Sequence, residues 1–123
     1  MTRPVNLSLI AFRFPIAAII SILHRISGVV LFIGMGYLAY LLSMSLQSAE
    51  SFAWVLHAMH HTAHGFFLWL VVSAVAYHFI AGIRHLLLDF HIGDSIEVSR
   101  GSAWAVLILS LVSSLLFGAW LVL

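Results

Sequence analysis

The feature that most constrains this chain is a set of three long apolar runs, at about residues 22–46, 62–88 and 103–123. An α-helix rises about 1.5 Å per residue, so about 20 apolar residues are enough to cross the roughly 30 Å hydrocarbon core of a bilayer. Each run reaches that length. The sequence therefore predicts an all-α membrane protein with three transmembrane helices.

Polar residues are scarce in this chain, and function is therefore sought among them. Of the 123 residues, 63% are hydrophobic and 7% are charged, and the length suits a single domain, 1–123. The absence of cysteine excludes an iron–sulfur cluster held by the chain's own thiolates. The net charge of +1, with no basic stretch, indicates no nucleic-acid binding.

The positions of the arginines predict how the chain is oriented in the membrane. Three arginines precede or open the first run and two flank the second connection, whereas the first connection contains Glu50 and no arginine: Arg3, Arg13, Arg25, Arg84 and Arg100. By the positive-inside rule, the N-terminus and the second connection are cytoplasmic and the C-terminus lies outside. We expect residues 1–20 to form a cytoplasmic segment and Ser21 to cap the first helix.

The second run contains a histidine at a depth where a polar side chain is costly. His78, Gly82 and His85 are spaced i, i+4 and i+7, which places them on one helix face. A neutral imidazole is a strong axial ligand of haem iron, and a glycine lets a flat macrocycle approach the backbone. Alternatively, His78 hydrogen-bonds a serine or carbonyl of a neighbouring helix. Spacing alone leaves both interpretations open.

Arg84 lies at the cytoplasmic end of the same helix. Its side chain either extends to the lipid headgroups or neutralises an anionic group, such as a haem propionate, at the membrane surface. Tyr77, next to His78, is interpreted as a packing aromatic.

The third run carries no ionisable residue, and we expect it only to pack against a neighbouring helix. Its small residues suit such a contact: Ser110, Ser113, Ser114 and Gly118.

A second group of polar residues opens the first run. Ser21, His24, Arg25 and Gly28 are spaced i, i+3, i+4 and i+7 and share one helix face. A hydroxyl, an imidazole and a guanidinium could hydrogen-bond the carbonyl oxygens of a quinone and deliver protons to it. The alternative is an interfacial anchor, with Arg25 among the lipid headgroups.

Four histidines form a third group near the first connection: His57, His60, His61 and His64. They share one face if the second helix extends outward. Two histidines at such spacing can bind a transition metal, although the group includes no carboxylate. The alternative is a solvated interfacial face.

Together these segments resemble the cytochrome b556 subunits of succinate dehydrogenase, which are small membrane anchors of bacterial respiratory complex II. Matching segments occur in order, at family-like spacing, from the N-terminus to about Phe90. They are Arg3-Pro4-Val5-Asn6-Leu7, Arg13-Phe14-Pro15, Ser21 to Gly28, Ala76-Tyr77-His78, Gly82-Ile83-Arg84-His85 and Asp89-Phe90. The third run contributes only its hydrophobicity, and the group of four histidines is not part of the family pattern.

The resemblance implies specific roles for the polar residues of the first two runs. His78 matches the family's axial haem b ligand, and a second anchor subunit supplies the other axial histidine. His24 and Arg25 match positions near the haem propionates, and His85 matches another histidine near the haem. Ser21 and Arg25 match the ubiquinone site. The chain would then be half of a two-subunit haem-binding helix bundle.

The resemblance also implies an activity and a location. A flavoprotein subunit would oxidise succinate, an iron–sulfur subunit would relay the electrons, and ubiquinone would be reduced near Ser21 and Arg25. This chain would be a non-catalytic anchor in the bacterial inner membrane, with its C-terminus in the periplasm. Two alternatives remain: the anchor of a quinol:fumarate reductase, or a non-redox structural or transport subunit with His78 in a proton path or a helix contact.

Overall fold

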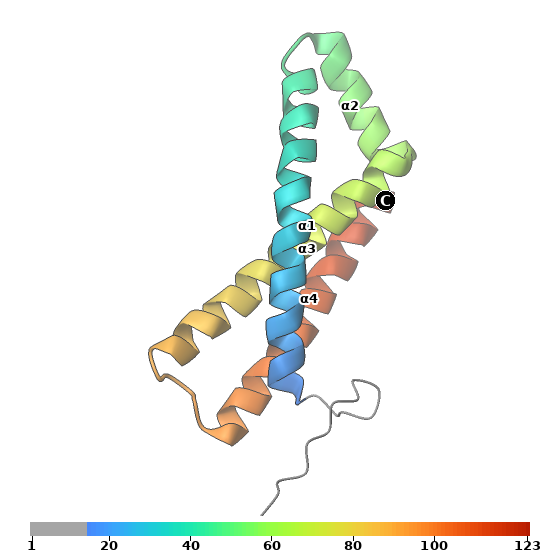
Figure 1. The fold of residues 1–123 in the computed structure, drawn as a ribbon. Helices are drawn as coiled ribbons and strands as arrows, with labels where there is room; N and C mark the ends of the chain where they lie inside the picture. The colour runs from blue at the N-terminus through green and yellow to red at the C-terminus, as the bar shows by residue number, and fades with distance from the viewer. Residues whose placement is uncertain (1–14) are drawn as a thin grey trace, which may run out of the picture.

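The computed structural model describes residues 15–123, and this part of the chain folds into four helices (Figure 1). They are α1 (Ile16–Ser45), α2 (Ala49–His61), α3 (Ala63–Asp89) and α4 (Ile96–Val122). Three of them, α1, α3 and α4, are long and apolar enough to cross a membrane. The prediction of an all-α protein with three transmembrane helices is confirmed.

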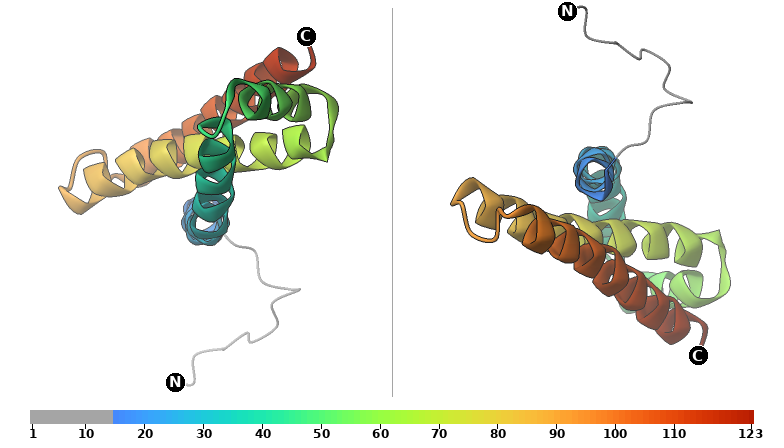
Figure 2. Two further views of the ribbon diagram at one scale, coloured as in Figure 1. Left: turned by 90° about the horizontal axis from the view of Figure 1, so that it is seen from above. Right: turned by 90° about the horizontal axis from the view of Figure 1, so that it is seen from below.

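The three long helices pack around a small apolar core. Helices α3 and α4 form an antiparallel pair, and α1 crosses them (Figures 1 and 2). Ile20 of α1, Ala81 of α3, and Ala103 and Val106 of α4 are buried together. The Tyr77 hydroxyl donates a hydrogen bond to the Ile20 carbonyl oxygen at 2.8 Å, in keeping with the packing role expected of this tyrosine.

The first helix begins earlier than the sequence predicted. Its N-cap is Pro15, whose carbonyl oxygen accepts hydrogen bonds from the backbone N–H groups of Ala18 and Ile19 at 3.0 and 3.2 Å. The prediction that Ser21 caps this helix is therefore wrong, because Ser21 lies inside α1. Residues 16–20, placed in the N-terminal segment on sequence grounds, form the first turns of α1, and residues 1–14 of that segment lie outside the described residues.

Both connections contain more helix than the sequence predicted. Most of the first is helix α2, which begins after Ser48, whose hydroxyl accepts a hydrogen bond from the Ser51 N–H. The second is short, because α4 begins at Ile96 instead of near residue 103. Ser95 caps α4, and the connection turns through two residues with left-handed backbone, His91 (φ 57°) and Gly93 (φ 69°).

Small residues of α4 mediate its contact with α3. The hydroxyls of Ser73 and Ser114 are 2.8 Å apart, and Trp69 Nε1 donates to the Ser114 carbonyl oxygen at 2.9 Å. A Cβ at Gly118 would lie 3.0 Å from that Trp69 nitrogen, so any larger residue would require the indole to shift by a few tenths of an ångström. The predicted small-residue contact is confirmed at these positions, whereas the Ser113 hydroxyl donates to its own helix at Leu109.

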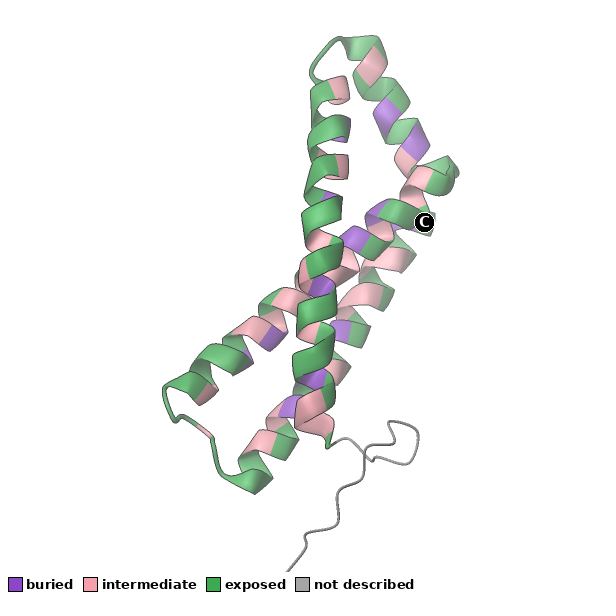
Figure 3. Ribbon diagram, in the orientation of Figure 1, coloured by how far each residue is buried: buried purple, intermediate pink, exposed green. Residues whose placement is uncertain are grey.

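Much of the apolar surface of this chain is exposed (Figure 3). On α1, Phe32 is 85% exposed and Ile33 is 69% exposed. Such a surface would aggregate in water but is ordinary where lipid tails or other transmembrane helices cover it. The fold thus leaves the outer face of α1 available for a neighbour in the membrane.

Candidate functional site

Three histidine rings come together where α1 crosses α3. The rings of His24 and His78 are stacked with centroids 4.0 Å apart and an interplanar angle of 13°. The His85 ring is 6.1 Å from that of His24, at 12°. His24 lies on α1 and the other two on α3, so two groups that are far apart in the sequence form one site. His24 and His78 are half-buried, and His85 is exposed.

Two glycines let the rings approach the opposite helix. A Cβ at Gly28 of α1 would lie 3.4 Å from His78 Cε1, and a Cβ at Gly82 of α3 would lie 3.5 Å from His24 Nε2. Those distances are ordinary van der Waals contact, so any side chain longer than a methyl group would compete with a ring for space. Each glycine therefore leaves space for a histidine ring of the opposite helix, a role that their spacing in the sequence did not indicate.

Ser27 orients the His78 ring, although the spacing of the polar residues in the sequence does not indicate a role for it. Its buried hydroxyl donates to the His24 carbonyl oxygen at 2.7 Å and lies 2.9 Å from His78 Nδ1. A hydroxyl has one hydrogen, so when it is donated to the carbonyl, Nδ1 must carry the proton of the second bond. His78 then holds its proton on Nδ1 and leaves the Nε2 lone pair available.

The structure agrees with both interpretations of His78, the helix contact and the haem ligand. His78 does hydrogen-bond a serine of a neighbouring helix, as the alternative proposed. The same bond selects the tautomer that binds metals through Nε2, because metal-bound histidines usually donate their other ring N–H to an oxygen. Among residues 15–123, no hydrogen bond engages His78 Nε2.

Arg84 takes a different position from both of those considered for it. It is 8% exposed, and its guanidinium donates to Ser102 Oγ at 3.0 Å and to the Ser99 carbonyl oxygen and hydroxyl at 3.1 and 3.0 Å. Arg84 therefore links α3 to the first turns of α4 and extends neither to the headgroups nor to the histidine rings. The reason is that α4 begins early enough to place two serines opposite it.

Replacing Arg84 by methionine is expected to destabilise the pairing of α3 with α4. Hydrogen bonds to a charged group contribute about 1.5–3 kcal/mol each, so we expect a loss of about 2 kcal/mol or more in stability. Thermal unfolding of the detergent-purified protein measures this loss. Arg100→Met is the matched control, because Arg100 is an exposed arginine of α4, and equal destabilisation by both changes would contradict the structural role of Arg84.

Ser21 and Arg25 lie one turn apart on α1 and are exposed. They adjoin His24 along the helix, but their side chains are directed away from the packed face that contains Ile20 and Ser27. No hydrogen bond described within residues 15–123 links them to the histidine rings. Any ligand they bind would also contact a surface outside the described residues.

The exposed end of the site carries a contact between a histidine and an aspartate. His85 Nε2 lies 3.5 Å from a carboxylate oxygen of Asp89, one turn further along α3, and both side chains are more than half exposed. An exposed pair of this kind contributes little to stability.

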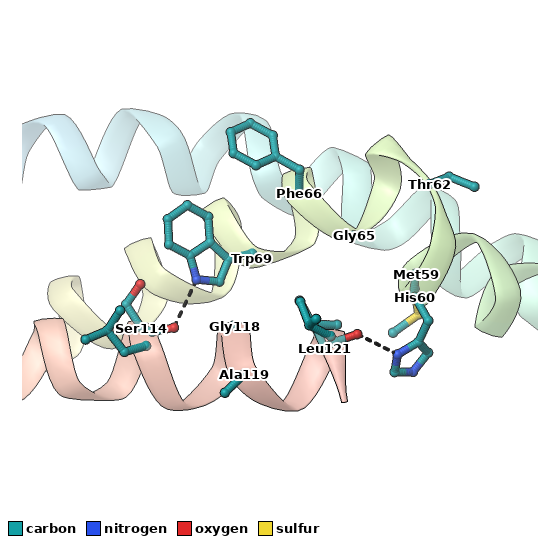
Figure 4. Close-up of a pocket in the computed structure, with 12 residues that line it drawn as sticks. Met59, His60, Thr62, Gly65, Phe66, Trp69, Ser114, Gly118, Ala119 and Leu121 are labelled. Carbon is teal, nitrogen blue, oxygen red and sulfur yellow. Dashed lines mark hydrogen bonds between the residues drawn. The ribbon is translucent and has the colours of Figure 1, made fainter.

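An apolar pocket lies far from the three rings, at the other end of α3 (Figure 4). Its volume is about 620 Å³, and it lies between the end of α2, the beginning of α3 and the end of α4. Trp69 and Gly118 line its floor, and His60 Nδ1 is hydrogen-bonded to the Leu121 carbonyl oxygen at 2.9 Å beside it. None of the residues expected at the haem or quinone site lines this pocket, and its apolar wall suits lipid or a packing side chain.

The group of four histidines is divided between two helices. Thr62 ends α2 and caps α3, where its hydroxyl accepts a hydrogen bond from the His64 N–H. His64 therefore lies on α3, whereas the other three histidines lie on α2. The Nδ1 atom of His64 is hydrogen-bonded to the Tyr37 hydroxyl at 2.9 Å. The condition for a shared face, a second helix that extends outward through all four histidines, is therefore not met, and no group of three or more potential metal-binding side chains occurs within residues 15–123.

Comparison with known proteins agrees with this architecture. Residues 1–117 match the model of a family described as the succinate dehydrogenase/fumarate reductase transmembrane subunit. The chain is 44% identical to a succinate dehydrogenase cytochrome b556 subunit of Coxiella burnetii, over 97% of this chain and 96% of that protein. It is 35% identical to the subunit of the same name in Paracoccus denitrificans, over 93% and 88% of the two chains. The chain belongs to the succinate dehydrogenase/fumarate reductase transmembrane subunit family.

Membership of this family confirms the resemblance noted in the sequence. A relative from Rickettsia felis, also named succinate dehydrogenase cytochrome b556 subunit, is 32% identical over 93% of this chain. The family match covers all the residues that form the histidine site and both exposed α1 residues. As a transmembrane subunit of this family, the chain is a multi-pass membrane protein and part of a larger enzyme.

Proposed function

We propose that this chain is the membrane anchor of a succinate:ubiquinone oxidoreductase, that it ligates haem b through His78, and that it contributes Ser21 and Arg25 to the ubiquinone site. The observation that carries the proposal is the hydrogen bond between Ser27 and His78. It orients the half-buried histidine midway along the apolar helix α3 and directs its proton to Nδ1. The relatives' cytochrome b556 names support a haem of this type.

The residues around His78 fit a haem in three ways. The Nε2 lone pair is available, as an axial ligand requires. Gly28 and Gly82 keep bulky side chains away from the histidine rings. The His24 and His85 rings, stacked toward the end of α3, offer N–H donors for the anionic propionates, with Arg25 adjacent to His24. A bound haem b would supply a site that accepts and releases one electron at a time.

The second axial ligand would come from another anchor subunit. Only one face of α1 is packed within the described residues, and its outer face exposes large apolar side chains such as Phe32 and Ile33. A second bundle of transmembrane helices on this face would cover it and could bring a histidine opposite His78. The partners in the soluble part would be an iron–sulfur subunit and a flavoprotein subunit, docked at the cytoplasmic ends of the helices.

Ser21 and Arg25 suit the polar head of ubiquinone. A quinone has two carbonyl oxygens on an otherwise apolar molecule, and it takes up two protons when it receives two electrons. The Arg25 guanidinium would donate hydrogen bonds to one carbonyl oxygen and stabilise the negative charge that develops on it. The Ser21 hydroxyl, one turn away on α1, would donate to the same head group. Both are exposed here, as residues at a subunit boundary would be.

The orientation that we propose places this site at the cytoplasmic surface of a bacterial inner membrane. Arg25 lies near the beginning of α1, and Arg84 and Arg100 lie near the connection between α3 and α4. Figure 1 shows the beginning of α1 and this connection at the same end of the bundle. The positive-inside rule assigns that end to the cytoplasm and leaves the C-terminus in the periplasm.

A reduced-minus-oxidised absorption spectrum of the detergent-purified complex tests the proposal. We expect a b-type signal and three co-purifying subunits: a second anchor, an iron–sulfur protein and a flavoprotein. A complex that contains these subunits but no haem would mean that His78 only contacts a neighbouring helix and does not ligate haem. A chain that purifies without them would contradict the anchor function.

Ser27→Ala is expected to retain the haem but to raise its midpoint potential. Loss of the acceptor for Nδ1–H makes His78 a weaker donor to ferric iron. A hydrogen bond worth about 1 kcal/mol corresponds to about 40 mV for a one-electron couple, so we expect a shift of tens of millivolts. Redox titration of the haem absorption measures it.

Ser45→Ala is the matched control for this change. The Ser45 hydroxyl also donates to the carbonyl oxygen three residues earlier in α1, that of Leu42, but it has no histidine beside it. Ser27→Thr retains a hydroxyl and is expected to keep the potential near that of the wild type. An unchanged potential in Ser27→Ala would contradict the orienting role of Ser27.

A further inference from the structure

The division of the four histidines between two helices leaves one close pair on α2, His57 and His61. Their spacing is i, i+4, their ring centroids are 4.8 Å apart and inclined at 46°, and both side chains are exposed. Neither ring makes a hydrogen bond within residues 15–123, in contrast to His60 and His64, which bind Leu121 and Tyr37. The proposed haem and quinone functions do not use this pair.

The separation of the two rings suits the binding of one metal ion between them. An ion about 2.0–2.1 Å from a ring nitrogen lies about 3.2 Å from the ring centroid, so two adjacent ligands at about 90–109° have centroids about 4.5–5.2 Å apart. The 4.8 Å separation of His57 and His61 falls in this range. The nearly parallel His24 and His78 rings, at 4.0 Å, are too close, and the His60 and His61 rings, at 6.3 Å, are too far apart.

The surroundings of the pair favour a cation. His61 is the last residue of α2, where the unpaired carbonyl groups give the helix terminus a partial negative charge. The carboxylate of α2, Glu50, lies at the opposite end of the helix. No third histidine or carboxylate within the described residues completes the site, so water would fill the remaining positions.

We infer that His57 and His61 form a two-histidine site for a divalent transition metal, with Cu²⁺ bound more tightly than Zn²⁺. Imidazole nitrogen suits both ions, and the general order of stability of divalent complexes places copper above zinc. The bound ion joins two successive turns at the end of α2. A helix of 13 residues is marginal by itself, so this link restrains fraying next to Thr62.

Copper titration of the purified complex tests the inference directly. The complex is purified through a tag that contains no histidine, treated with a chelator and titrated with CuCl₂, with electron paramagnetic resonance as the readout. We expect one tightly held equivalent whose spectrum shows coupling to two nitrogens. His57→Ala and His61→Ala are each expected to weaken it by about tenfold or more, because one imidazole and water remain.

Two histidine variants serve as matched controls. His60→Ala removes a neighbouring ring of the same helix, and His91→Ala removes an exposed histidine of the connection between α3 and α4. Both are expected to bind copper like the wild type. Copper binding that survives His57→Ala and His61→Ala, or that is weakened equally by His60→Ala, would overturn the inference. Hydrogen exchange at the end of α2 should slow with copper in the wild type and remain unchanged in His61→Ala.

Discussion

Replacing His78 by leucine is expected to eliminate or strongly shift the b-type absorption of the purified complex. Leucine has a similar volume and suits the apolar surroundings of α3, so the helix should still pack, but it cannot ligate iron. The loss follows from the position of His78, the only histidine of the three stacked rings whose Nδ1 is held by a buried hydroxyl. The measurement is the reduced-minus-oxidised spectrum, normalised to the amount of co-purified subunits.

His64→Leu is the matched control for that experiment. His64 is also a half-buried histidine of α3 whose Nδ1 pairs with a hydroxyl, that of Tyr37, but it lies at the other end of the helix. Its replacement should leave the haem spectrum unchanged. If His78→Leu retains an unaltered spectrum, another residue ligates the haem and the proposed site is wrong.

Replacing Arg25 by alanine is expected to reduce ubiquinone reduction on the order of 10²-fold while succinate oxidation by an artificial acceptor continues. Removal of one preorganised donor to a developing negative charge typically has an effect of this size. Because Arg25 is exposed on α1 and makes no hydrogen bond with other residues of the described chain, its loss should not disturb the packing of the bundle. Parallel assays with a ubiquinone analogue and with an artificial electron acceptor separate the two activities.

Arg100→Ala controls for the general loss of a positive charge at the same membrane surface. Arg100 is exposed on α4 and is not among the residues proposed to bind the quinone. We expect ubiquinone reduction and succinate oxidation by the Arg100→Ala complex to remain close to those of the wild type. An equal decrease of both activities in Arg25→Ala would mean that Arg25 supports assembly of the complex instead of quinone binding.

The spans and the residues of the histidine site could be identified from the sequence because each depends on local spacing. Long apolar runs predict transmembrane helices whatever their neighbours are. The i, i+4 and i+7 spacing placed His78, Gly82 and His85 on one face, and the structure brings this face against His24 and Gly28 of α1. The helical nature of the first connection was missed, since α2 is shorter and less apolar than a membrane span.

Contacts between distant segments could not be predicted from the sequence. Nothing near Arg84 in the sequence indicates that Ser99 and Ser102 receive its guanidinium, because this depends on where α4 begins. Likewise, the sequence does not distinguish Ser27 from any other small residue of an apolar helix. Its role depends on the crossing of α1 and α3, which places it against His78. A single threonine, Thr62, decided that the four histidines do not share one helix face.

The sequence by itself determined that this chain crosses a membrane three times and which few polar side chains could bind a cofactor or substrate. The reason is that hydrophobic length and helical periodicity are properties of neighbouring residues. Only the tertiary structure decided which tautomer of His78 is held, where Arg84 is directed and which two histidines of α2 make no hydrogen bond within residues 15–123. Those outcomes depend on hydrogen bonds and packing between helices, which form only when residues far apart in the chain meet.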